Sequence, residues 1–390
     1  RAADVVAPPY DVLDSDEARV RADGRPWSFL HVSRAEIDLP EGTDPYAPEV
    51  YDRAADNLRH MLDAGVLVRD TMPCYYVYRL KMGEHIQTGL VAAASIGAYD
   101  ANRIRRHEFT RPTKEDDRVR QIEALNAQTG PVLLACRSDP VVNEILARVT
   151  GDTPEVDLVA DDGISHSLWV VHDRTLIDDI TRRFDAMPAL YIADGHHRSA
   201  AASRVAAGRG LQGDAGTFLT VIFPHDQMLI LDYNRVVRDL HGLSPENFLA
   251  RVSERFSLSP SASPVSPEGT GRFGMYLPGQ WYALQIGSGH IPDDPVGRLD
   301  VSLLADNLLA PLLGIDDPRR DPRIDFVGGI RGLQELERRV DSGEMAVAFS
   351  ICPTRMDDLM AVADAGEVMP PKSTWFEPKL ADGLVSLVID

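Results

Sequence analysis

The sequence predicts a mixed α/β protein with more than one lobe. Between residues 89 and 225, strand-like apolar runs alternate with segments of helical periodicity, which is typical of a compact α/β core. The chain has 390 residues, of which 44% are hydrophobic and 26% charged, so it is long enough for two or three domains. A stretch rich in Ser, Pro and Gly at 257–271 lacks an aliphatic period, and it predicts a linker.

The elements before the linker follow from periodicity. Residues 49–64 repeat apolar side chains at helical spacing and are followed by Gly65, so they predict a helix. Residues 74–80, with a Tyr-Tyr-Val-Tyr core, and 89–96 predict strands. The segments that follow predict helices at 117–125, 141–149 and 175–184 and strands at 132–136, 167–171 and 188–193.

A smaller α/β lobe is expected after the linker. Residues 300–309 form an amphipathic helical pattern with Asp300 as a plausible N-cap, and strands are expected near 324–327 and 345–350. The predicted division is therefore N-terminal elements packed on the core at 1–88, the core at 89–256, the linker at 257–271 and the lobe at 272–390.

Charge and cysteine content limit the classes of partner. The net charge of −20 argues against nucleic acid as a general partner, although a small anion could still bind a local basic pocket. Cys74, Cys136 and Cys352 fit no metal-ligand spacing and are expected to be buried thiols in a reducing compartment. Because no apolar run approaches about 20 residues and no signal peptide is visible, we expect a cytoplasmic protein without a membrane partner.

The most informative motif is Asp194-Gly195-His196-His197-Arg198. It follows a short apolar run and precedes an Ala-rich segment, so it predicts a strand turning tightly into a helix. The first turn of a helix offers free N–H groups and a positive dipole end, and these side chains suit phosphate oxygens. Alternatively, Asp194 caps the helix, Gly195 makes the turn and the histidines are surface groups. Four polar or ionisable residues in five positions exceed what a cap requires, and this favours a ligand site.

The rare lysines mark two further segments. Only four of the 40 Lys and Arg residues are Lys, so a Lys suggests a position where a compact ammonium is needed. Lys114 belongs to the segment 106–118, and Lys372 and Lys379 belong to 369–379. Chance and codon bias are the alternative explanation.

The Lys372 segment resembles a phosphate-binding P-loop in spacing only. Pro371 stands where the second Gly should be, and proline supplies no N–H for a backbone nest. Lys372, Ser373 and Thr374 therefore remain candidates to contact an anion through their side chains. Alternatively, the neighbouring aromatic residues pin the C-terminal tail to the core and the lysines are incidental.

Glu108 is the candidate general base. It follows the strand pair, and a carboxylate there can deprotonate a hydroxyl within hydrogen-bond reach. Polar and basic side chains suited to phosphate binding surround it: His107, Thr110, Lys114 and Arg118. An ion-paired surface loop is the alternative. Together with Asp194, which could hold Mg²⁺, and the His/Arg cluster, the set contains the parts that phosphoryl transfer needs.

These residues carry a family resemblance. The turn at 193–198 resembles the signature of the ParB/sulfiredoxin superfamily, in the Asp-Gly-His-His-Arg form of its free L-serine kinases. Over nearly its whole length the chain resembles the DUF1015 family, whose recurrent segments appear here at 7–12, 107–110, 114–118, 193–198 and 369–379. The resemblance implies a ParB/sulfiredoxin-like α/β core.

The resemblance also implies roles for residues. Those kinases bind a nucleotide phosphate chain and Mg²⁺ around the turn and use an upstream Glu to activate the serine hydroxyl. Because the stretch between Glu108 and Asp194 looks longer here, Asp11 and Glu36 are alternative acids. The C-terminal lobe has no counterpart in the compact kinases, so it could replace a nucleotide, close the site or form a homodimer.

The resulting hypothesis is a small-molecule kinase that converts L-serine to O-phosphoserine with ATP, ADP or pyrophosphate and Mg²⁺. The assigned residues are Glu108, Asp194 and His197 for catalysis, Asp194 and Glu108 for the metal, and Gly195, His196, Arg198, His107, Thr110, Lys114, Arg118, Lys372, Ser373 and Thr374 for phosphate or nucleotide binding. The alternatives are a nucleotide-binding regulator or slow hydrolase, and a non-catalytic assembly protein. The sequence alone fixes neither the donor nor the acceptor.

Overall fold

The computed structural model describes residues 1–210 and 213–389 and separates into two compact units. Unit 1 comprises Arg1–Met228 together with the chain from Pro378 onward, and unit 2 comprises Leu229–Glu377. The predicted mixed α/β class is confirmed. The division differs from the expected one, because the segment inserted into the sequence of unit 1 begins before the predicted linker and ends before the C-terminal tail.

Unit 1 contains most of the predicted elements. Its helices are α1 (Ala2–Val5), α2 (Ser15–Ala22), α3 (Leu30–Ser33), α4 (Pro48–Asp63), α5 (Ile96–Asp100), α6 (Pro112–Leu125), α7 (Pro140–Val149), α8 (Arg174–Ala186) and α9 (His196–Gly208), with short 3₁₀ turns η1 (Tyr10–Val12), η2 (Ala35–Asp38), η3 (Gly213–Gly216) and η4 (His225–Gln227). Its strands are β1 (Tyr75–Met82), β2 (His85–Ser95), β3 (Ile104–Arg105), β4 (Ala127–Gln128), β5 (Val132–Cys136), β6 (Val156–Val159), β7 (Ser165–Val171), β8 (Leu190–Asp194), β9 (Thr217–Pro224) and β18 (Leu387–Val388).

An eight-stranded sheet organises unit 1, in the order β3-β8-β5-β9-β2-β1-β7-β6. The β3/β8 and β5/β9 pairs are parallel, and the other neighbours are antiparallel. Every residue of the central strand β5 is buried, which explains its continuous apolar sequence. The short β4 pairs with β18 in a separate ladder.

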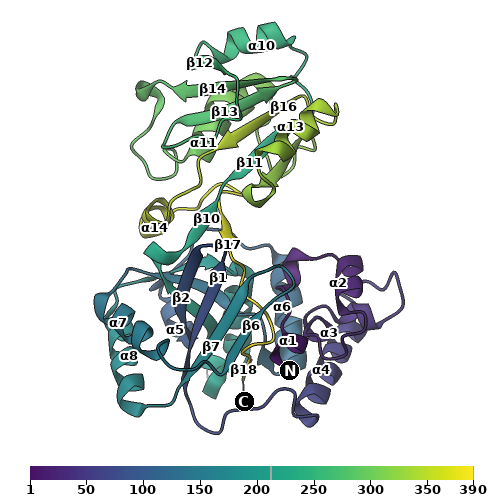
Figure 1. The fold of residues 1–390 in the computed structure, drawn as a ribbon, viewed down its shortest axis with the longest axis vertical. Coiled ribbons are helices and arrows are strands. Elements are labelled where there is room, and N and C mark those ends of the chain that lie inside the picture. The colour runs from purple at the N-terminus through teal and green to yellow at the C-terminus, as the bar shows by residue number, and fades with distance from the viewer. Residues whose placement is uncertain (211–212, 390) are drawn as a thin grey trace. The chain divides into compact units, whose positions relative to one another are not determined.

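Helices cover the sheet of unit 1 through apolar faces. Buried side chains of α7 and α8 pack on β1, β2 and β7, and those of α5 and α9 pack on β5, β8 and β9. Asp139 and Asp173 begin α7 and α8 by accepting hydrogen bonds from backbone N–H groups of the first turn. Figure 1 shows α2, α3 and α4 grouped beside α6, and these helices share a second apolar cluster.

Unit 2 is built on an antiparallel sheet. Its strands are β10 (Leu229–Leu231), β11 (Tyr233–Val237), β12 (Phe256–Ser261), β13 (Arg272–Leu277), β14 (Gln280–Ile286), β15 (Ile324–Gly328), β16 (Val347–Ile351) and β17 (Trp375–Glu377), and its helices are α10 (Pro245–Val252), α11 (Asp300–Leu304), the π-helical η6 (Ala305–Leu309), α12 (Ala310–Leu313), α13 (Leu333–Asp341) and α14 (Met356–Asp364), with 3₁₀ turns η5 (Ser288–His290) and η7 (Gly329–Arg331). Six strands form the sheet β12-β14-β13-β16-β11-β15, while β10 pairs with β17. Apolar side chains of α13 pack on the six-stranded sheet.

Two expectations in unit 2 require correction. The predicted linker overlaps β12, an edge strand whose Pro260 lacks an N–H, and a sheet edge tolerates such a residue. Asp300 is the first residue of α11, and its N-cap is Leu299. The Asp300 carboxylate accepts the N–H of Gly271 at 2.6 Å.

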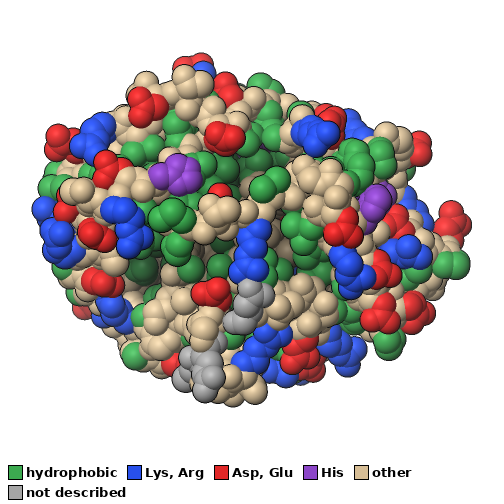
Figure 2. Space-filling view, turned by 90° about the horizontal axis from the view of Figure 1, so that it is seen from below, with side chains coloured by type: hydrophobic (Ala, Val, Ile, Leu, Met, Phe, Trp, Pro, Cys, Tyr) green, Lys and Arg blue, Asp and Glu red, His purple; other side chains and the backbone are tan. Residues whose placement is uncertain are grey.

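The cysteine and charge expectations have mixed outcomes. All three cysteines are free thiols; Cys136 is buried as expected, whereas Cys74 and Cys352 are half-buried. One face of the molecule, seen in Figure 2, mixes basic with acidic side chains, so the net charge of −20 does not gather there as a patch of one sign. Among the described helices, none is long and apolar enough to span a membrane.

Candidate functional site

Sheet topology brings the two predicted motifs of unit 1 together. Because β3 runs parallel to β8, both strands end at the same edge of the sheet. The loop with Glu108 follows β3, and the Asp194–Arg198 turn follows β8. The predicted strand, tight turn and helix are confirmed, with Gly195 at φ 98°, a conformation that favours glycine. A Cβ at Gly195 would also lie 3.1 Å from Arg198 Nε.

Asp194 does not cap α9. Its carboxylate accepts the N–H of Gly195 at 2.8 Å, and α9 has no side-chain cap hydrogen bond among the described residues. The capping interpretation is therefore wrong. The positive end of the α9 dipole lies at this turn. Because no side-chain cap among the described residues occupies the first-turn N–H groups, these groups can bind an anion.

Two cations converge on Asp194. Its Oδ2 lies 3.5 Å from Lys379 Nζ and 3.8 Å from an Arg198 guanidinium nitrogen. Burial would raise the pKa of Asp194, but Lys379 and Arg198 outweigh burial and lower it below its ordinary value. Asp194 is thus ionised near neutral pH, and its side chain is 36% exposed.

Arg198 is held from several sides. It donates to the carbonyl of Pro131 and lies 3.9 Å from Asp11, while only 10% of its side chain is exposed. Burial opposes its charge, yet Asp11 and Asp194 raise the pKa of Arg198 above its ordinary value. The Arg198 guanidinium is therefore a buried, permanently charged group that is held in place beside Asp194.

The histidines of the site are neutral near pH 7. His196 and His107 are buried with ring centroids 4.5 Å apart, and burial lowers the pKa of both, that of His107 to about 4. His196 Nε2 accepts the His107 N–H at 3.5 Å, so its proton lies on Nδ1, which is 3.9 Å from Glu108 Oε2. His196 is therefore placed to orient Glu108, whose side chain is 54% exposed.

His197 is oriented by the loop that contains Glu108. Its Nε2 accepts the N–H of Arg111 at 3.0 Å, and burial together with the charge of Lys114 lowers its pKa. Lys114 is exposed, whereas Thr110 donates to Glu115.

Arg118 and the two alternative acids, Asp11 and Glu36, each have a partner of opposite charge. Arg118 pairs with Asp117 at 2.7 Å and lies 3.9 Å over the Tyr10 ring. Of the alternative acids, Asp11 lies beside Arg198, whereas Glu36 is buried and paired with Arg34 at 2.9 Å.

Lys372, Ser373 and Thr374 belong to unit 2. Lys372 has a positive φ of 59°, and its ammonium lies 5.4 Å from the centre of the Tyr233 ring. The Ser373 hydroxyl donates to the carbonyl of Pro370 at 2.6 Å. The assignment of these residues to phosphate binding stays a prediction.

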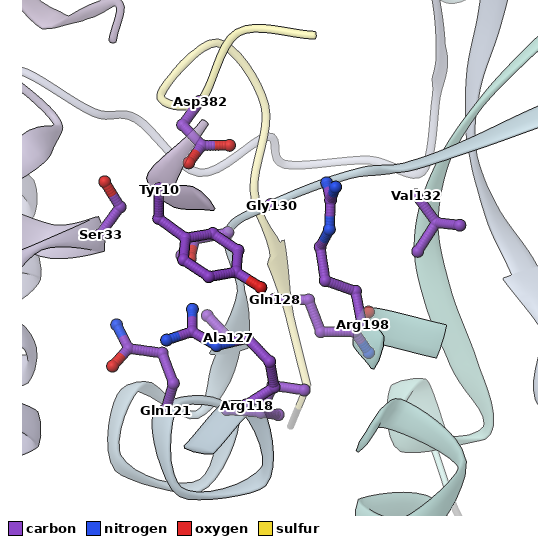
Figure 3. A pocket seen from close by; sticks show the side chains of 12 residues that line it. Tyr10, Ser33, Arg118, Gln121, Ala127, Gln128, Gly130, Val132, Arg198 and Asp382 are labelled. Atoms are coloured by element: carbon purple, nitrogen blue, oxygen red, sulfur yellow. The ribbon is translucent and has the colours of Figure 1, made fainter. Parts of the chain in front are cut away.

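The site assignment did not include two C-terminal residues, Lys379 and Asp382. The rarity of Lys had marked Lys379, but no sequence pattern had marked Asp382. Figure 3 shows Asp382 with Tyr10, Arg118 and Arg198 around a pocket of unit 1 whose cavity volume is about 30 Å³.

The donor set fits Mg²⁺ only in part. Among the described residues, no group of three or more His, Cys, Asp or Glu side chains could hold a metal ion. Magnesium commonly uses one or two carboxylates and completes its octahedron with water and substrate phosphates. The ionised, partly exposed Asp194 fits such a shared site.

Comparisons with known proteins place the chain in a family. Residues 1–302 match the family model described as a protein of unknown function, DUF1015. No curated protein matches. The chain is similar to a Glu-to-Gln mutant of a free serine kinase in complex with AMP, with 12% identity, 77% of this chain and 92% of that chain covered, and a TM-score of 0.39.

Two further solved structures are similar at the same level. One is SbnI with a C-terminal truncation from Staphylococcus aureus, with 12% identity, coverage of 77% and 87%, and a TM-score of 0.40. The other is a conserved hypothetical protein from Pyrococcus furiosus, with 14% identity, coverage of 75% and 94%, and a TM-score of 0.35. Likeness at these TM-scores assigns no activity to this chain.

Proposed function

The chain belongs to the DUF1015 family, and from the geometry around Asp194 we propose that it is a phosphotransferase. It would move a phosphoryl group from ATP, ADP or pyrophosphate to an alcohol, with free L-serine as the first acceptor to test. The proposal includes a ParB/sulfiredoxin-like core around β8 and α9, which the motif resemblance suggests.

The convergence of positive groups on one open, ionised carboxylate carries the proposal. Lys379 and Arg198 lie 3.5 and 3.8 Å from Asp194, and the α9 N-terminus points to the same turn. A phosphate chain placed there would meet backbone N–H groups and two cations at once. Stabilisation of charge and positioning are the main contributions that phosphoryl transfer requires from a protein.

Glu108 supplies the base in this proposal. It is exposed enough to meet a hydroxyl, and the neutral His196 beside it can hold its orientation without neutralising its charge. The hydroxyl proton would pass to a Glu108 carboxylate oxygen as the hydroxyl oxygen bonds to phosphorus. The bond between that phosphorus and the bridging oxygen of the donor would break, and ADP, AMP or orthophosphate would leave when ATP, ADP or pyrophosphate is the donor. Asp194 would hold Mg²⁺, which would supply further neutralisation of charge.

The direct test is product formation. Purified protein is incubated with Mg²⁺, L-serine and ATP, ADP or pyrophosphate in turn, and O-phosphoserine is sought by phosphorus NMR. We expect product with one donor. Saturable nucleotide binding without product would point instead to a nucleotide-binding regulator, and absence of both would refute the phosphate site.

A matched pair of variants tests the base. Glu108→Gln should abolish turnover and leave nucleotide binding nearly intact, because it removes proton acceptance and preserves shape. Glu123→Gln, on an exposed position of α6, is the control and should behave as the unmodified protein. Unchanged turnover in Glu108→Gln would remove Glu108 from this role.

A further inference from the structure

The pocket of unit 1 that Arg198 lines contains two polar atoms that are buried and unpaired. Asp382 is 2% exposed and Ser33 is 8% exposed. Within residues 1–210 and 213–389, neither Asp382 Oδ1 nor Ser33 Oγ has a hydrogen-bond partner. Both residues line the cavity of about 30 Å³. Buried polar atoms normally have partners, so two unpaired atoms around one cavity mark it as a candidate site for a polar group.

Figure 3 shows Ser33, Tyr10 and Asp382 around this pocket. Gly130 also lines it, and a Cβ there would lie 3.6 Å from Asp382 Oδ1. The absence of a side chain at Gly130 thus preserves space beside the unpaired oxygen.

The charges of the pocket favour a cationic occupant. Each arginine that lines it already has its own acid: Arg118 pairs with Asp117 at 2.7 Å, and Arg198 lies 3.9 Å from Asp11. Ionised Asp382 is therefore the carboxylate in excess. Burial raises the pKa of Asp382 to about 7, and Asp11 adds to the rise, although Arg198, Arg118 and the backbone N–H of Tyr10 oppose it.

We propose that this cavity binds an ammonium group, with Asp382 and Ser33 as its acceptors. An ammonium offers three N–H donors and a positive charge, and a cavity of this volume accommodates a group about the size of water. The site would prefer a ligand that carries an amine over one that does not, whether or not the chain transfers phosphate.

Binding measurements test this without turnover. At a pH of about 8, where Asp382 is mostly ionised, calorimetry compares ethanolamine with 1-propanol, which has the same length and hydroxyl but a methyl group in place of the ammonium. We expect ethanolamine to bind at least about tenfold more tightly, as a charged hydrogen-bonded pair commonly provides. Asp382→Asn should remove this preference, whereas Asp63→Asn, at an exposed position of α4, should retain it.

Two further measurements test the site even if Asp382→Asn fails to fold. Gly130→Ala keeps every polar group, meets only ordinary contacts and narrows the cavity, so it should weaken ethanolamine binding without lowering the melting temperature. In the unmodified protein, ethanolamine should lower the carbon-13 NMR titration midpoint of the Asp382 carboxyl. Equal binding of the two probes, or an unmoved midpoint, would mean that the cavity holds an ordered water only.

The outcomes separate this site from the kinase proposal. Ethanolamine binding that depends on Asp382, without O-phosphoserine formation, would retain the ammonium site and refute serine phosphorylation. O-phosphoserine formation with no amine preference in binding would support serine phosphorylation and refute the ammonium site.

Discussion

Replacement of Asp382 by Asn should remove one contribution to the pH dependence of the free energy of unfolding. The unfolded chain releases this proton near 3.8, whereas the folded protein retains it until about 7. The folded state therefore binds more protons between these values, and the free energy of unfolding falls as pH rises through that window. A difference of about three pKa units corresponds to about 4 kcal/mol in full, of which about 2–3 kcal/mol is lost between about pH 5 and pH 8.

Urea denaturation of both proteins at these two pH values measures the effect. Asn keeps the shape of the side chain and cannot ionise, so the variant should gain about 2–3 kcal/mol relative to the unmodified protein on going from pH 5 to pH 8. Taking the difference between the proteins cancels the other titrating groups. A difference that does not depend on pH, or one that has the opposite sign, would refute the assignment of a buried, protonated Asp382.

Three other predictions follow from the site. Gly195→Ala should lower the free energy of unfolding by about 1–3 kcal/mol and weaken nucleotide binding, because alanine is strained at φ 98°, whereas Gly208→Ala, which meets nothing within 4 Å, should not; denaturation and calorimetry check both. Lys379→Ala should weaken nucleotide binding by about tenfold or more, while Lys81→Ala, at an exposed position of β1, should leave calorimetric affinity unchanged. Burial lowers the pKa of His107 from 6.5 to about 4, so stability should fall as pH decreases through this window, and His107→Gln should flatten that part of a urea-denaturation series.

Periodicity identified the elements that support the turn in unit 1. The apolar runs that became β5 and β8 have the length and burial of central strands, and the amphipathic segments that became α7 and α8 begin with Asp side chains that cap them. Glycine before His196 correctly indicated the tight turn, because a positive φ is inexpensive only for glycine. Such local signals need no knowledge of distant contacts.

Partner choice could not be read from local patterns. Asp194 looked like a helix cap, but its N–H partner is the adjacent Gly195 and its cations include Lys379, far along the sequence. The segment at 257–271 looked like a linker because Ser and Pro have low strand preference, yet β12 gains its stability from pairing with β14. The Lys379 contact and the pairing of β12 with β14 are tertiary contacts, which local patterns do not reveal.

The C-terminal segment explains why the site was only partly visible. The match to the family model ends at residue 302, whereas Lys379 and Asp382 come from the segment that returns to unit 1 after unit 2. That segment is anchored by β18 pairing with β4, by the Ala7 and Asp382 backbone bridge and by the fully buried Ile389. Closing a long insertion costs entropy that grows only slowly with its length, so buried apolar residues of the returning segment can offset it. The same residues that hold the segment in the core of unit 1 thus place a cation at Asp194 and a carboxyl behind Arg198, and the pocket is complete only once the chain has returned.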